Sequence, residues 1–339
     1  MSNEAFWMNG IGKETRVGPA ELKNPAYGQV LIKAIAVPVL PGEWKIHAGL
    51  IPIPLNLPTV IGLVVAGFVE KVGFGVTRFK AGDRVAANST GVATNDPRFG
   101  SLQKYVIAPE TLTMKIGDTP FEEAATLVSG WAAYSALFRA LPLEPPINGQ
   151  ITKKNEKVLI WGASSVLGSV AVQVAEAAGY NVVGVASGRN ANLVKSLGNV
   201  QFVDRASVTA ADDVLALGPY KAVFAAQDDA EDQVKIGKVL AAQGGGTFNS
   251  TAGNRSGVTL PEGVTATFHQ YLFDFLKPEE REFTKWVWWG HFEEAIISRR
   301  LTPIPWEVRG DLTAVAGAWE SLRNGSVSGK RLIIKPNQE

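Results

Sequence analysis

Short apolar runs separated by glycine-containing turns characterise the first third of the chain. Val30–Val37 and Leu63–Val72 are apolar or alternating runs, the pattern of β-strands that bury one or both faces. Gly73–Gly75 and Lys80–Asp83 carry residues that favour turns between such strands. The pattern predicts an all-β segment over residues 1–120.

Helical spacing begins after residue 120, where Glu122–Arg139 is predicted to form one helix. A proline-rich connection over residues 142–155 follows, and strand-length runs then alternate with helical patterns. The predicted strands are Lys157–Trp161, Asn181–Ala186, Gln201–Asp204, Ala222–Ala225 and Gly246–Asn249, with Thr265–Phe268 as an additional candidate. Such alternation predicts a parallel, doubly wound sheet and hence an α/β fold.

The C-terminal region adds one predicted helix, Pro278–Arg300, and one predicted strand, Lys330–Lys335. The helix carries Trp286, Trp288 and Trp289. We expect these rings in the core or at a subunit interface rather than on a stacking platform. Because the doubly wound sheet is already complete, the last strand is expected to return to the β segment.

A strand, a turn and a helix follow one another over Lys157–Ala178. Gly162 and Gly168 stand six residues apart, with Ser164 where a dinucleotide-binding turn usually has its middle glycine. Small residues leave room for a pyrophosphate beside the unpaired N–H groups at the helix start. The predicted contacts of this turn are Gly162, Ser164, Ser165 and Val166. The other interpretation is an ordinary strand-to-helix turn.

The residues after the second predicted strand indicate which dinucleotide binds. An NAD site has an Asp or Glu about twenty residues past the glycine turn, where it binds the ribose hydroxyls. Ser187–Asn190 contains Arg189 and no carboxylate. Arg189 would attract a 2′-phosphate, and Arg205 could reach the same pocket. The sequence therefore predicts NADP(H), with contacts from Ser187, Arg189, Asn190 and Arg205. The alternative is that both arginines are solvated surface residues.

The charge balance of the 339-residue chain is close to neutral, with 33 Lys and Arg against 32 Asp and Glu. This balance gives no reason to expect binding to nucleic acid or to an acidic membrane surface. With no cysteine and three scattered histidines, disulfides are excluded and no metal site is predicted. Neither a secretory signal nor a membrane-spanning run is recognised, so a cytoplasmic protein is expected.

An ordered set of motifs extends over nearly the whole chain. The motifs are Leu40–Lys45, Gly62–Val72 with Phe79–Val85, Glu123–Leu127, Ser164–Gly168 and Gly325–Lys330. Together they resemble zinc-free medium-chain dehydrogenase/reductases of the quinone reductase and fungal trans-acting enoyl reductase branch. The resemblance implies a GroES-like β-barrel domain over residues 1–120 and 311–339. It also implies an inserted Rossmann NADP-binding domain over residues 121–310, and cofactor contacts from Lys45, Phe268, Val327 and Ser328.

The chain departs from the pattern of these relatives at three motif positions. Relatives usually carry an acidic residue where this chain has Val64, and an Asn and an Asp where it has Leu40 and Glu43. The expected cleft is therefore more apolar than in relatives. These departures indicate a hydrophobic small-molecule substrate and leave the usual substrate contacts in doubt.

Without a metal, the expected reaction is conjugate reduction. Hydride goes to the β-carbon of an unsaturated carbonyl, and charge develops on its oxygen. Lys45 is the candidate donor to that oxygen; otherwise it contacts the cofactor ribose or is a surface lysine. Thr126 and Tyr134, in the matching helical region, are the other candidate catalytic residues.

Three functions remain open from the sequence. The first is an NADPH-dependent reductase of an enoyl or enone C=C bond, with fungal secondary metabolism as its setting. The second is a quinone or carbonyl reductase on the same fold. The third is a non-redox isomerase, cyclase or binding protein that retains an NADP site. The sequence also leaves open whether the chain is a monomer or a homodimer, and whether the substrate is free or bound to a carrier protein.

Overall fold

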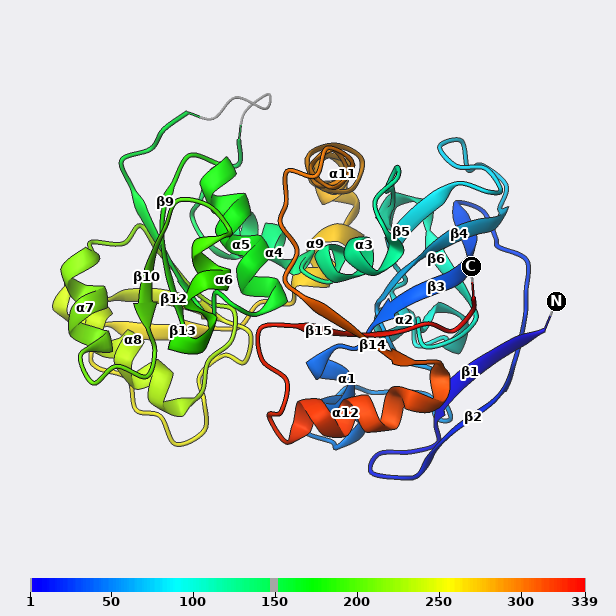
Figure 1. Ribbon diagram of the computed structural model, residues 1–339, viewed down its shortest axis with the longest axis horizontal. Coiled ribbons are helices and arrows are strands. Elements are labelled where there is room, and N and C mark those ends of the chain that lie inside the picture. The colour runs from blue at the N-terminus through cyan, green and yellow to red at the C-terminus, as the bar shows by residue number, and fades with distance from the viewer. Residues whose placement is uncertain (1, 147–151, 339) are drawn as a thin grey trace. The chain divides into compact units, whose positions relative to one another are not determined.

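The computed structural model describes residues 2–146 and 152–338, which form two compact units (Figure 1). Unit 1 comprises Met1–Ser129, Glu282–Arg300 and Pro305–Glu339, and unit 2 comprises Gly130–Arg281 and Leu301–Ile304. Residues 282–300, which the sequence analysis places with the cofactor domain, pack within unit 1. The functional domain boundaries at residues 120 and 311 stay a prediction.

Unit 1 is built mainly of antiparallel strands. Its strands are β1 (Asn3–Met8), β2 (Thr15–Ala20), β3 (Gln29–Pro38), β4 (Val64–Val72), β5 (Arg84–Asn88), β6 (Tyr105–Pro109), β7 (Thr113–Lys115), β14 (Trp306–Gly310) and β15 (Arg331–Ile334). Among the described residues, β14-β15-β3-β4-β5-β7 run in this order, with β6 paired to β3, while β1 and β2 form a separate ribbon. The C-terminal strand does return to the β segment, because β15 pairs antiparallel with β3 at Ile333 and Pro38.

The strands of unit 1 enclose its apolar core. β3 is nearly continuously buried, since neighbouring strands and helices cover both of its faces. Helices α1 (Pro41–His47) and α12 (Val315–Arg323) pack against each other, and Trp319 of α12 joins the same core. The all-β prediction for residues 1–120 is therefore wrong in detail, because α1 and the short α2 (Gly91–Thr94) interrupt the strands.

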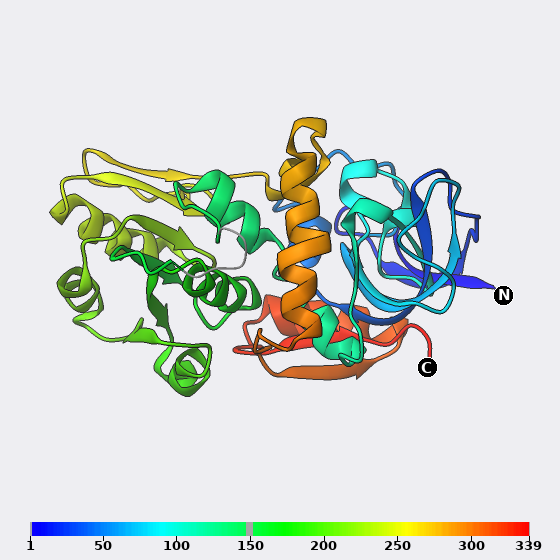
Figure 2. The same cartoon turned by 90° about the horizontal axis from the view of Figure 1, so that it is seen from above.

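A helical segment rich in tryptophan belongs to unit 1. It runs through α10 (Arg281–Trp286), a π-helical turn (Val287–His291) and α11 (Phe292–Ile297), and Figure 2 shows it as one long orange rod. The prediction of one regular helix missed this turn, where Gly290 has φ −128° and ψ −105°. Trp288 is fully buried, which confirms a core position for this ring.

Unit 2 holds a parallel sheet with flanking helices. Its strands are β8 (Lys157–Trp161), β9 (Asn181–Ala186), β10 (Val200–Asp204), β11 (Ala222–Ala225), β12 (Gly246–Ser250) and β13 (Val264–Thr267). Its helices are α4 (Ala132–Ser135), α5 (Val166–Ala177), α6 (Ala191–Lys195), α7 (Ala210–Leu217), α8 (Ala230–Ala242) and α9 (Tyr271–Leu276). The strand order β10-β9-β8-β11-β12-β13 is that of a doubly wound dinucleotide-binding sheet, as predicted.

Burial on both faces explains why the central strand β8 is a nearly continuous apolar run. Leu159 and Trp161 of β8 pack with residues of α7 and α8, whereas Val158 and Ile160 are buried on the opposite face. The predicted helix Glu122–Arg139 is not continuous, because α3 (Phe121–Val128) ends before Gly130. A Cβ on Gly130 would lie 2.5 Å from a methyl of Val170, so close packing against α5 favours glycine there.

Candidate functional site

The turn after β8 requires glycine at both of its predicted positions. Gly162 has φ +80°, and a Cβ there would lie 2.7 Å from the backbone N and O of Gln227. A Cβ on Gly168 would lie 2.2 Å from the carbonyl oxygen of Gly162. At both glycines the backbone of the loop after β8 therefore packs directly against other backbone atoms. Neither position has a side chain that could cover the N-terminus of α5.

The N-terminus of α5 is capped by Ser165, and Ser164 ties the turn to Asn190. Ser165 Oγ accepts a hydrogen bond of 3.0 Å from the Gly168 N–H, and Ser164 Oγ accepts one of 3.1 Å from Asn190 Nδ2. Val166 is the first residue of the helix. Exposed N–H groups and the helix dipole at this end suit the binding of an anion such as a pyrophosphate. The structure thus brings Gly162, Ser164, Ser165, Val166 and Asn190 together.

The loop after β9 lies at the same edge of the sheet, since parallel strands share their carboxyl ends. Ser187 is half-buried, while Arg189 is exposed and makes no ion pair with any described residue. Asp204, at the end of β10, holds this loop through its Oδ1, which accepts hydrogen bonds from the N–H of Gly188 (2.8 Å) and of Ala206 (3.0 Å). The sequence analysis missed this positioning role, because it depends on β10 lying beside β9.

Arg205 faces the start of α8. Its guanidinium lies 3.1 Å from the carboxylate of Asp232 and 3.8 Å from that of Asp229. Burial raises the pKa of Asp232, and the charge of Arg205 opposes that shift. Asp229 and Asp232 also form the capping box of α8, so Arg205 stabilises a helix start. Its contact with a cofactor phosphate stays a prediction.

The remaining predicted residues are divided between the units. In unit 1, Lys45 lies in the last turn of α1 with its Nζ 5.9 Å from the Trp44 ring centroid, and Thr126 Oγ1 donates to the Glu122 carbonyl at 2.8 Å. Val327 and Ser328 are half-buried in the segment before β15. In unit 2, Tyr134 is fully buried and Phe268 is exposed just after β13. Their roles at a common site stay predictions.

Two clusters of polar side chains at the carboxyl edge of the unit 2 sheet were not predicted from the sequence. Asp228, after β11, accepts hydrogen bonds from Ser250 (2.7 Å), Gln233 (2.9 Å) and Arg255 (2.7 Å). Asp274 of α9 accepts hydrogen bonds from His269 and Ser135. Both clusters depend on contacts between segments far apart in the chain, so no local sequence pattern indicates them.

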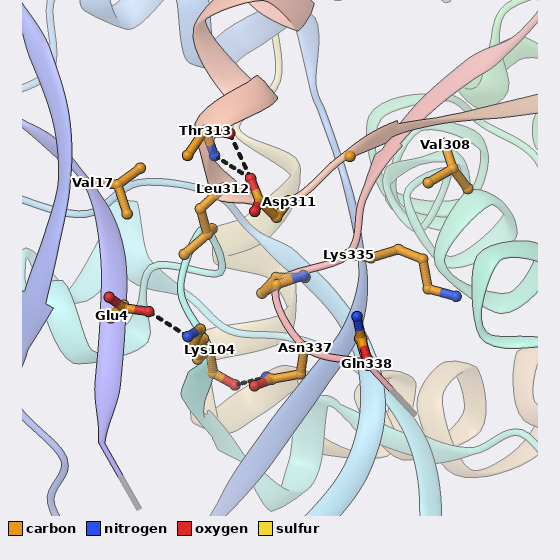
Figure 3. A pocket seen from close by; sticks show the side chains of 12 residues that line it. Glu4, Val17, Lys104, Val308, Asp311, Leu312, Thr313, Lys335, Asn337 and Gln338 are labelled. Atoms are coloured by element: carbon orange, nitrogen blue, oxygen red, sulfur yellow. Dashed lines mark hydrogen bonds and ion pairs between the residues drawn. The ribbon is translucent and has the colours of Figure 1, made fainter.

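A surface hollow of about 800 Å³ lies in unit 1, and none of the predicted site residues lines it (Figure 3). Its polar groups already have partners within the fold. Lys104 pairs with Glu4 and Lys335 with Glu122, while Asp311 accepts hydrogen bonds from the N–H and hydroxyl of Thr313. We therefore do not assign a ligand to this hollow.

Over residues 2–146 and 152–338, no group of three or more His, Cys, Asp or Glu side chains is arranged to hold a metal ion. The described helices include none that is both long and apolar enough to cross a bilayer.

Unit 1 is thus a β-rich domain, and unit 2 is an α/β domain with the strand order of a dinucleotide-binding sheet. Residues 26–118 match the alcohol dehydrogenase GroES-like domain family. The chain is 31% identical to the trans-enoyl reductase himH of Aspergillus japonicus, over 98% of this chain and 97% of that protein. The chain belongs to the medium-chain dehydrogenase/reductase family.

Solved structures share the fold at lower sequence identity. The quinone oxidoreductase of Pseudomonas syringae pv. Tomato DC3000 is 24% identical, with a TM-score of 0.77, over 99% of this chain and 100% of that chain. A mycobacterial protein whose structure is complexed with NADPH is also 24% identical, with a TM-score of 0.72 over the same shares. These likenesses confirm the predicted α/β fold class.

Proposed function

We propose that the protein is an NADPH-dependent reductase of an activated C=C bond in a hydrophobic small molecule. The observation that carries the proposal is the turn between β8 and α5, where two obligatory glycines and a serine cap leave a helix N-terminus open to a pyrophosphate. Family membership over nearly the full chain and the trans-enoyl reductase name of a relative support the reaction type. Fungal secondary metabolism is part of the same proposal.

NADPH is favoured over NADH by the loop after β9. Arg189 is the exposed cation of this loop, and a charge-assisted contact to a 2′-phosphate needs such a side chain. Asp204 is the nearby acid, but its Oδ1 already accepts hydrogen bonds from the N–H of Gly188 in this loop and from the N–H of Ala206 after β10. We therefore expect the arginine rather than the carboxylate to decide the cofactor preference.

Titration with both cofactors tests this preference. NADPH should bind more tightly than NADH, and Arg189→Ala should weaken NADPH binding by about ten- to a hundredfold, as for loss of one charged hydrogen bond. NADH binding should change little in the same variant. Arg323→Ala, which removes an exposed arginine of α12, is the control. Equal affinities for the two cofactors, or an unaltered NADPH affinity in Arg189→Ala, contradict the proposal.

The protein's part in the reaction is alignment and charge stabilisation. NADPH supplies a hydride when it is bound, and the residues of the chain must bind it and stabilise the charge that develops on the substrate carbonyl. Lys45 is our proposed donor to that oxygen, with Thr126 and Tyr134 as further candidates. The apolar side chains of Leu63, just before β4, and of Val64, its first residue, support a hydrophobic substrate.

A quinone or carbonyl reductase is the second candidate, supported by the name of the Pseudomonas structure with the same fold. A non-redox isomerase or cyclase that keeps the cofactor site is the third. Absorbance of reduced nicotinamide, followed separately with enones and with quinones, distinguishes all three. Oxidation with enones supports the first, oxidation with quinones alone the second, and turnover without oxidation the third.

A further inference from the structure

The strand order of unit 2 fixes which part of its edge faces the reacting end of a dinucleotide. A bound dinucleotide would place its pyrophosphate at the turn after β8 and its adenosine half toward the loop after β9. Its nicotinamide half would then extend the opposite way, over the carboxyl ends of β11, β12 and β13. β13 is three strand spacings from β8, about 14 Å. His269 follows the end of β13 by two residues, on the nicotinamide side.

His269 is held in a defined orientation at that edge. Its Nε2 donates a 2.6 Å hydrogen bond to Asp274 Oδ2, and the two side chains are 30% and 4% exposed. Ser135 of α4 donates a second hydrogen bond to the same oxygen at 2.5 Å, and Lys277 Nζ lies 3.6 Å from Oδ1. Asp274 is thus a buried acceptor held by Ser135 of α4 and by Lys277 at the end of its own helix. The imidazole remains accessible, with Nδ1 as its second nitrogen.

Conjugate reduction needs a proton as well as a hydride, and the polar side chains at this edge differ in what they can supply. Asp228 is buried and occupied by Ser250, Gln233 and Arg255. The Tyr271 hydroxyl donates to Asn249 at 2.7 Å, and burial raises its pKa, which makes it a poorer acid. His269 combines exposure with a fixed orientation, and histidine is the side chain most often used as a general acid or base.

We propose that His269, oriented by Asp274, is the catalytic acid that completes the reduction. This inference rests on the proposed function. Hydride transfer from NADPH to the β-carbon forms the new C–H bond, and the electron pair of the C=C bond moves onto the carbonyl oxygen as an enolate. The imidazolium of His269 then gives its proton to the α-carbon as the carbonyl re-forms. NADP⁺, the reduced product and neutral imidazole result, and the imidazole regains a proton from water.

The experiment compares His269→Gln and His269→Ala with the wild-type protein, using NADPH and a simple enone. Turnover should fall by about a hundredfold or more in both variants, the range for loss of a general acid. NADPH affinity should stay within about twofold of wild type. Added imidazole should restore part of the turnover of His269→Ala, which a merely structural histidine would not show. His47→Gln is the control, because His47 also bonds a single acceptor, the Lys13 carbonyl, at 2.7 Å.

The outcomes separate this inference from the function on which it rests. If the wild-type protein oxidises NADPH with the enone and His269→Gln does so at the same rate, only the assignment of His269 is overturned. A fall in turnover that imidazole does not rescue, accompanied by weaker NADPH binding, also overturns it in favour of a structural role. If no enone is reduced by the wild-type protein, the proposed function fails and this inference fails with it.

Discussion

Glu43 is a buried carboxyl group inside unit 1, two residues before Lys45 in α1. It is 3% exposed, and its Oε2 accepts a 3.1 Å hydrogen bond from the indole N–H of Trp319. Burial raises the pKa of Glu43 to about 7, and the charge of the buried Arg331 only partly offsets this effect. The side chain therefore changes charge near neutral pH, within the core that positions α1.

The ionisation of Glu43 should make stability depend on pH. Because the folded pKa of about 7 lies above the unfolded value of 4.5, the folded state binds the extra proton. Protonation of Glu43 therefore stabilises the folded state, fully below pH 4.5. As pH rises through 7 this contribution is lost, and the free energy of unfolding falls by up to about 3 kcal/mol. Glu43→Gln keeps the shape without the charge, so its free energy of unfolding should fall less over this range.

Urea unfolding at a series of pH values measures this difference. Glu320→Gln, which changes an exposed glutamate of α12, serves as the control and should follow the wild-type curve. Parallel curves for wild type and Glu43→Gln between pH 4.5 and 8 would show that Glu43 ionises normally in the folded protein.

At the scale of elements, the strand–turn–helix unit of β8 and α5 depends on backbone contact at Gly168. In Gly168→Ala the new Cβ would lie 2.2 Å from the Gly162 carbonyl oxygen, so the turn must shift. We expect a destabilisation of about 1–3 kcal/mol and at least about tenfold weaker NADPH binding. Thermal unfolding and cofactor titration measure the two effects.

Gly317→Ala is the matched control for this variant. Gly317 lies in α12, and a Cβ there meets nothing within 4 Å. Alanine should stabilise the helix by roughly 0.5–1 kcal/mol and leave cofactor binding unchanged. Unaltered NADPH affinity in Gly168→Ala would mean that the turn is not the pyrophosphate site.

Strands and helices whose burial shows directly in their pattern of apolar residues could be predicted from the sequence. The central strands β8, β9 and β11 were predicted because both faces of each strand are buried, so that each strand is a nearly continuous apolar run. The break at Gly130 and the π-helical turn at Gly290 could not, because each reflects packing or backbone geometry that helical spacing does not encode. The spacing of apolar residues indicates which positions are buried, but it does not indicate where a helix is interrupted.

At the scale of the whole molecule, the parts of the candidate site formed by neighbouring residues in the sequence could be predicted. The parts formed by residues far apart in the sequence could not. The glycine turn and Ser165 are local, and the structure confirms their geometry. His269 meets Ser135 only through Asp274, and Arg205 meets Asp232 only because α8 starts beside β10. Long-range contacts of this kind have no signature in the spacing of a single sequence.

The central claim is that the chain transfers a hydride from NADPH to carbon. The most direct measurement incubates the protein with an enone and NADPH deuterated at the transferring position, then locates the label in the product. Our account predicts one deuterium at the β-carbon for each NADPH consumed. Product that forms without the label and without NADPH oxidation would contradict the account and show that the protein is not a reductase.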